Sequence, residues 1–327
     1  MRFRRLLLPA RVLALALLGS RWAAAPVDYR QSGHNHFFNL EYDEAIKDYT
    51  RLIEQDRDDP IAYNHLASAY LYKELYRLGM LESSALRGDN EFLRQKRASP
   101  DSQVKARFEQ ALEQGRQVAE SLLARNRRNE LALYALGTNY ALRGNYEFIV
   151  DKAWFAALRH GSKGREFCEQ VRKINPEFVD AYLVLGVYEY VVGNLPLPVK
   201  ILAAIGGFHG SKEKGAAYVA RVAREGNVAR NDARVLLVIL YRRERRPLEA
   251  ARVLEGLIAD FPRNYILGLE LGAMYADAGQ PDRALVTFKS QLKKAEDKAP
   301  GYERLPRDAV QRRIERLEGQ MAPLAHR

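Results

Sequence analysis

A spacing of small and aromatic residues recurs along this chain of 327 residues and constrains its fold more than any other feature. The clearest copy lies in residues 265–298 and contains, in order, Leu271-Gly272, Tyr275, Gly279, Ala284 and Phe288. A small residue such as Gly272 lets two antiparallel helices approach closely, and aromatic side chains then fill the space beside them. Gly279 falls where the turn between two such helices would lie. The pattern therefore predicts a pair of packed antiparallel helices.

Related copies precede this one and divide the chain into units. Three earlier first helices carry an apolar–small pair and a nearby tyrosine, namely Leu66-Ala67 with Tyr70, Leu136-Gly137 with Tyr140, and Leu185-Gly186 with Tyr188. We expect six units, the first matching only in its second half, at about 26–59, 60–128, 130–178, 179–229, 231–264 and 265–298. Residues 303–321 have helical periodicity and no unit after them, so we expect them to cap the array.

The pattern resembles the tetratricopeptide repeat, in which one helix carries Leu-Gly-x-x-Tyr and its partner carries Ala-x-x-x-Phe. The resemblance is most specific at 60–70, 130–146, 179–188 and 231–288. It implies an all-α fold, a right-handed superhelical solenoid of antiparallel helix pairs. That single solenoid would span residues 26–322, with two inserts and a C-terminal capping helix. The resemblance also implies that the chain binds a protein or peptide partner.

In arrays of this type the first helices line a concave groove, and four positions of each unit usually contact the ligand. Carried over residue by residue, these positions are Asn64, Ser68, Tyr134, Thr138, Leu183, Tyr190, Asp232, Arg242 and Leu269. The set is mixed aromatic and polar, which suits an extended peptide or a helix of a partner. Few of its members are basic, which argues against a groove dedicated to carboxylate tails.

Two apolar segments interrupt the period, at residues 148–158 and 195–208. Our hypothesis is that these inserts pack on each other on one side of the solenoid. An alternative is contact with a membrane surface. The segments would not cross the bilayer, because about 14 apolar residues are too few to span it. Such a role would require Trp154, Phe155, Leu197 and Ile201 to be exposed on one surface.

Residues 1–25 have the layout of a secretory signal peptide, with an arginine-rich start, an apolar run and three alanines. Pro9 and Arg11 interrupt the apolar run, and Pro26 follows the expected cleavage point. The segment is therefore expected to be either a signal peptide or a short N-terminal anchor. Both predict an exported protein, located in the periplasm or associated with the cell envelope.

Charge and composition argue against other classes of function. The net charge is +11, but five arginines lie in the first 25 residues and the remaining bases are scattered among acids, so no nucleic-acid partner is expected. Cys168 is the only cysteine, and we expect it to be a small buried hydrophobe. His34 and His36 are two residues apart, a spacing that does not place two ligands on one helix face.

No nucleophile–base arrangement and no phosphate-binding glycine loop is recognisable in the sequence. We therefore expect no enzyme activity, no cofactor, no metal and no small-molecule substrate. The sequence predicts a non-catalytic scaffold or adaptor in the bacterial cell envelope that holds a partner in the concave groove. The alternative is a membrane-associated assembly or trafficking factor that uses the apolar insert 195–208, with peripheral membrane contact.

Overall fold

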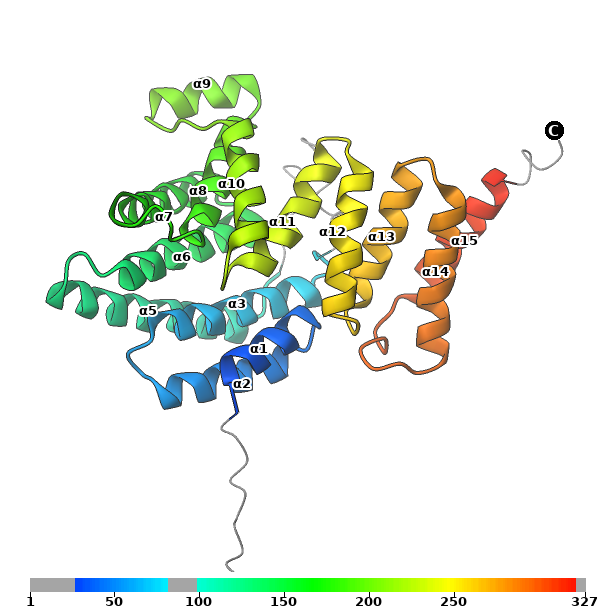
Figure 1. Cartoon of the computed structure of the whole chain (residues 1–327), viewed down its shortest axis with the longest axis horizontal. Coiled ribbons are helices and arrows are strands. Elements are labelled where there is room, and N and C mark those ends of the chain that lie inside the picture. Colours follow the sequence, from blue (N-terminus) through cyan, green and yellow to red (C-terminus); the bar gives the residue numbers. More distant parts are fainter. Residues whose placement is uncertain (1–26, 82–98, 322–327) are drawn as a thin grey trace, which may run out of the picture.

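The computed structural model describes residues 27–81 and 99–321, and all regular structure in these ranges is helical (Figure 1). The all-α solenoid expected from the repeats is confirmed. The α-helices are α1 (Tyr29–Phe38), α2 (Tyr42–Gln55), α3 (Pro60–Arg77), α5 (Ser102–Arg125), α6 (Glu130–Tyr146), α7 (Trp154–Ile174), α8 (Ala181–Gly193), α9 (Leu197–Ile205), α10 (Lys212–Glu225), α11 (Arg230–Arg243), α12 (Pro247–Asp260), α13 (Tyr265–Asp277), α14 (Pro281–Glu296) and α15 (Arg307–Met321). The segment 1–25, expected to be a signal peptide or an anchor, lies outside the described residues.

Local sequence explains where several first helices begin. Asp59 precedes α3 and its carboxylate accepts the backbone N–H of Ile61 at 2.9 Å. Asn129 caps α6 in the same way through Ala132, at 3.0 Å. These side-chain oxygens satisfy N–H groups that have no partner within the helix, a contribution of about 1 kcal/mol for each cap.

The small residues of the repeat have the packing role expected of them. A Cβ atom added to Gly272 would lie 2.6 Å from the ring of Phe288. A Cβ atom added to Gly137 would collide with Cys168, which is fully buried. Gly279, at the turn between α13 and α14, has a φ of +70°, which glycine adopts without strain. Close helix approach therefore depends on the absence of a side chain at these positions.

The segment 148–158 differs from the expected insert because it is helical almost throughout. Residues Glu147–Asp151 extend α6 as a π-helical turn, η2, and after Lys152, with a φ of +54°, α7 starts at Trp154. Gly161 and Gly164 both lie within α7, although glycine has a low helix propensity. Gly164 packs directly on the backbone of α6, and this tertiary contact outweighs the low helix propensity of glycine.

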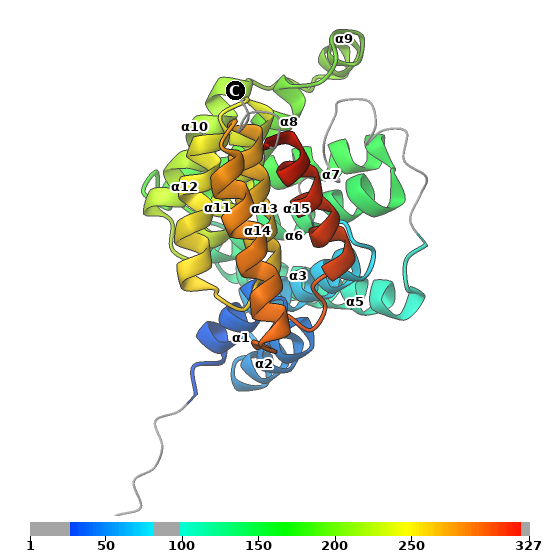
Figure 2. The ribbon, with the colours of Figure 1, turned by 90° about the vertical axis from the view of Figure 1, so that its right-hand side faces the viewer.

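The segment 195–208 contains α9, which stands away from the rest of the molecule (Figures 1 and 2). The hypothesis that the two inserts pack on each other is wrong. Phe155 is 84% exposed in one insert, and Leu197 and Ile201 are 71% and 54% exposed in the other. Trp154 is partly buried and its ring packs edge-on against Phe148 within its own segment.

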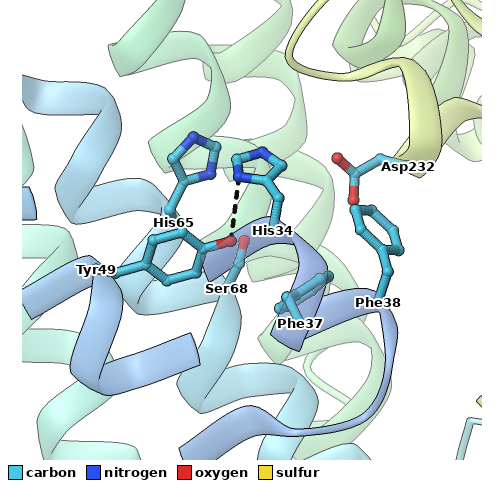
Figure 3. Close-up of a pocket in the computed structure, with 7 residues that line it drawn as sticks. All are labelled: His34, Phe37, Phe38, Tyr49, His65, Ser68 and Asp232. Carbon is cyan, nitrogen blue, oxygen red and sulfur yellow. Dashed lines mark hydrogen bonds between the residues drawn. The ribbon is translucent and has the colours of Figure 1, made fainter. Parts of the chain in front are cut away.

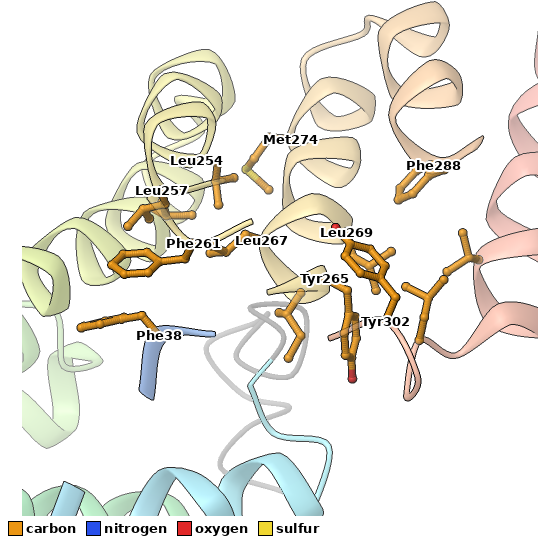
Figure 4. Packing of buried hydrophobic residues seen from close by; sticks show 14 of the residues in the cluster. Phe38, Leu254, Leu257, Phe261, Tyr265, Leu267, Leu269, Met274, Phe288 and Tyr302 are labelled. Carbon is orange, nitrogen blue, oxygen red and sulfur yellow. The ribbon is translucent and has the colours of Figure 1, made fainter. Parts of the chain in front are cut away.

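The first unit returns to contact the fifth and sixth units, far away in the sequence (Figure 4). The ring of Phe38 in α1 stacks on Phe261 after α12, with 4.9 Å between centroids. Asn264 donates its side-chain N–H to the carbonyl of Phe38 at 2.7 Å. The guanidinium of Arg263 binds both carboxylate oxygens of Glu41, at 2.6 and 2.9 Å. The array therefore closes on itself, and its own side chains fill much of the space enclosed by the units.

Candidate functional site

The nine predicted groove residues differ in how far they are buried. Asn64, Tyr190 and Leu269 are buried, at 3%, 4% and 1% exposure. The amide of Asn64 donates to the carbonyl of Ala135 at 2.8 Å and accepts from the amide of Asn139 at 3.0 Å, so it joins α3 to α6. These buried side chains hold helices together and are not accessible to a ligand, which corrects the sequence-based expectation for them.

The predicted groove residues also differ in their polar partners. The hydroxyl of Tyr190 donates to Glu244 at 2.9 Å. The guanidinium of Arg242 pairs with Glu270 at 3.0 Å and with Asp277 at 3.1 Å. Thr138 and Leu183 are partly buried. The nine residues therefore do not line one open groove in the described part of the chain, and partner binding by any of them stays a prediction.

Ser68 and Asp232 both line a small pocket, where α1, α2 and α3 face the start of α11 (Figure 3). The pocket has a volume of about 20 Å³, which is room for one water molecule. Its other lining residues are His34, Phe37, Phe38, Tyr49 and His65. The pocket is too small for a substrate or for a peptide side chain.

Burial changes the titration of the groups around this pocket. It raises the pKa of Asp232 to about 7, with a smaller contribution from the neighbouring charge of Asp180. Burial also lowers the pKa of His65 well below its usual value, and the pKa of His34 is lowered for the same main reason. For both imidazoles and for the carboxyl group, burial shifts the pKa in the direction that favours the neutral form, as expected in a closed interior.

A larger cleft, which we call the acidic cleft, lies where three inter-helix turns come together beside the first turn of α6. Its volume is about 580 Å³, within the range of binding pockets. Its apolar wall consists of Ile61, Leu131, Tyr134, Phe178, Val179 and Val228. Six carboxylates surround that wall, from Asp56, Asp58, Asp59, Glu177, Asp180 and Glu225, together with Arg30 and Asn227.

The carboxylates of the acidic cleft have two different roles. Asp180 accepts three backbone N–H groups at the start of α11, from Asn227 at 2.8 Å, Val228 at 3.1 Å and Ala229 at 3.2 Å. Asp59 caps α3 and pairs with Arg30, so both residues stabilise the fold. By contrast, Asp56 and Asp58 are exposed and give the rim of the cleft negative charge. Glu177 and Glu225 are also exposed, but both pair with Arg221, at 3.5 and 3.1 Å.

The cleft contains one residue of the predicted groove, Tyr134, whose ring packs 5.1 Å from that of Phe178. Most of the other lining residues lie in turns between units, whereas the resemblance directs attention to chosen positions of the first helices, so the sequence did not indicate them. The run from Asp56 to Asp59, with three acids in four residues, was the available signal. What it could not show is that turns far apart in the sequence meet at one edge.

Within residues 27–81 and 99–321, no group of three or more His, Cys, Asp or Glu side chains is arranged to hold a metal ion. In the same ranges, no helix has the length and apolar character needed to cross a bilayer. The described structure therefore offers two features for a functional interpretation, namely the acidic cleft and the exposed helix α9.

The model of the tetratricopeptide repeat matches residues 31–76 and 235–301 of this chain. No curated protein matches it. Among solved structures, a thermophilic tetratricopeptide repeat protein of Thermus thermophilus is 14% identical, with coverage of 76% of this chain and 97% of that one and a TM-score of 0.40. Yeast Tom70 is 12% identical, with coverage of 90% and 89% and a TM-score of 0.26. Residues 31–76 and 235–301 therefore match tetratricopeptide repeats, and the regular structure of the described residues is helical throughout.

Proposed function

We propose that this protein is a non-catalytic scaffold that binds a protein partner at the acidic cleft. Repeats of this type indicate a protein-interaction scaffold. The observation that carries the proposal is the combination of a cleft of about 580 Å³, an apolar wall and a rim of exposed carboxylates. Leu131, at 46% exposure, offers an apolar contact at the mouth of the cleft.

The chemistry of the cleft selects the kind of segment that would bind. An apolar side chain of the partner would replace water against Phe178 and Val228, and lysine or arginine beside it would face Asp56, Asp58 and Glu177. An acidic segment would meet like charges and be excluded. The partner segment is therefore basic and amphipathic. The arginine-rich residues 1–25 support a location in the cell envelope, where we propose that the partner is found.

A pair of designed peptides tests the proposal. We expect an amphipathic Lys/Leu peptide to bind and the Glu/Leu peptide of the same pattern not to bind, by fluorescence anisotropy at low and moderate salt. The double variant Asp56→Asn, Asp58→Asn keeps the side-chain oxygens that serve the turn and removes two charges. It should weaken binding by about threefold to tenfold, because each exposed charge contributes about 0.2–1 kcal/mol.

The matched control is Asp282→Asn, Glu296→Gln, which removes two exposed charges on α14, away from the cleft. This control should leave the affinity unchanged. Equal binding of both peptides, or equal weakening by both double variants, would show that only the overall charge of the protein matters and would contradict the proposed site.

A further inference from the structure

The helix α9 presents an apolar face with no covering element in the described structure. Exposed fractions are 71% for Leu197, 54% for Ile201, 67% for Leu202 and 79% for Ile205, whereas Ala203 is buried at 7%. At 100° per residue, Leu197, Ile201 and Ile205 form one stripe with Leu202 beside it, on the side of the helix opposite Ala203. We propose that α9 is an interfacial helix that binds the surface of an anionic lipid bilayer.

The position of α9 allows this contact. Figure 2 shows the helix projecting beyond the main body. Pro196 precedes the helix and Gly206-Gly207 follow it, with Gly207 at a φ of +82°. An interfacial helix buries its apolar face about 5–10 Å into the headgroup region, a depth close to the diameter of a helix. The helix can therefore reach that depth while the body stays outside the bilayer.

Charge around α9 agrees with an anionic surface. Between Glu189 and Glu213 the chain has no carboxylate, while it has Lys200 within α9. Lys212, after α9, pairs with Glu244 at 2.7 Å and so contributes less. Lys200 is exposed, and its ammonium group donates to the carbonyl of Gly193 at 2.9 Å. Lysines at the edge of an apolar face are typical of helices that lie on anionic membranes.

The size of the face favours lipid over a protein partner. A helix of nine residues is about 14 Å long and about 10 Å wide. One face of it therefore offers much less surface than the roughly 800 Å² that each partner buries in a stable protein interface. A bilayer needs no complementary shape and solvates each apolar side chain separately. A spanning role is excluded for α9 by its length, because a bilayer core requires about 20 residues.

The experiment reports the surroundings of α9 itself, so its result does not depend on whether residues 1–25 anchor the chain to a vesicle. An environment-sensitive fluorophore is attached to the full chain at Ile201→Cys, with Val286→Cys on α14 as the matched control at 70% exposure. The native Cys168 is fully buried and stays unlabelled in the folded protein. Vesicles are phosphatidylcholine alone or with about one third phosphatidylglycerol.

With the anionic vesicles, we expect a blue shift and quenching by spin-labelled lipids for the label at 201, and neither change at 286. The double substitution Leu202→Ser, Ile205→Ser should lower the vesicle affinity reported by that label by at least about tenfold. Because both side chains are exposed, the thermal unfolding midpoint should not change.

Two results would overturn the proposal. One is an unchanged spectrum at 201 with both kinds of vesicle. The other is a blue shift that needs no vesicles and disappears on dilution, because that outcome would assign the face to a second copy of the chain.

Discussion

At the scale of single residues, Asp232 has a pKa in the folded protein that differs strongly from its value in water. Burial, and then the charge of Asp180, raises its pKa from 3.8 to about 7 in the folded protein. A raised carboxyl pKa means that the folded state binds the proton more tightly than the unfolded state does. The associated stability is therefore fully present below about pH 4 and is lost as the pH rises through about 7.

Replacement of this carboxyl group by an amide should consequently stabilise the protein only at pH values at which Asp232 would be charged. We expect Asp232→Asn to exceed the wild type in free energy of unfolding by on the order of 1–4 kcal/mol at pH 8. The difference should approach zero at about pH 3, below the pKa of 3.8 of the unfolded state. Urea unfolding at both pH values measures it, with Asp282→Asn as the exposed control. A difference of equal size at both pH values would contradict the raised pKa.

Asn139 is the second residue with a marked individual role. Its buried amide donates to Asn64 at 3.0 Å and to the carbonyl of Leu112 at 2.8 Å, and thereby joins α6 to α3 and α5. We expect Asn139→Ala to lower the free energy of unfolding by about 2–4 kcal/mol, because two buried acceptors lose their donor. Exposed Gln110→Ala on α5 should change it by less than about 0.5 kcal/mol. Similar values for the two variants would mean that water replaces the lost donor.

At the scale of elements, α7 allows a comparison of two glycines in one helix. A Cβ atom at Gly164 would lie 2.7 Å from the backbone oxygen of Gly137, which cannot move without shifting α6. A Cβ atom at Gly161 has only Tyr188 nearby, at 3.8 Å. The two positions therefore differ in available space and share the same helical backbone.

Alanine at these positions should act in opposite directions. We expect Gly164→Ala to destabilise the protein by about 1–3 kcal/mol through overpacking. Gly161→Ala should stabilise it by about 0.5–1 kcal/mol, because alanine is the better helix former. Chemical denaturation of the two variants tests both signs, and destabilisation by Gly161→Ala would show that the helices approach more closely there than described.

At the scale of the whole molecule, the contact between the first unit and the fifth and sixth units determines the shape. Phe38→Ala removes the ring that stacks on Phe261 and should lower the free energy of unfolding by about 3–5 kcal/mol. It should also weaken the contact between these units. In hydrogen exchange, we expect faster exchange in α1 and, together with it, in α12 and α13, although these helices lie far from α1 in the sequence. Exposed Val286→Ala is the control. Faster exchange confined to α1 and α2 would mean that the closure contributes little to the C-terminal units.

Local sequence patterns predicted most of the individual helices. Leu271-Gly272, Tyr275 and Phe288 act through contacts within one pair of helices, so their spacing alone reveals the pair. The continuation of α7 through Gly161 and Gly164 was not predictable in this way. There the contact with α6 outweighs helix propensity, and no local pattern records which side chain a glycine faces.

The sequence by itself determined an all-helical repeat array and its small-residue contacts, because each depends on residues within one helix pair. Only the tertiary structure decided what is accessible. The predicted groove residue Asn64 is buried because it bonds to α6, and Leu269 is buried in the same cluster as Phe38 and Phe261. The acidic cleft exists because turns from distant units meet at one edge. Curvature accumulates from small rotations at every interface between units, and the spacing of residues within one unit carries no record of that sum.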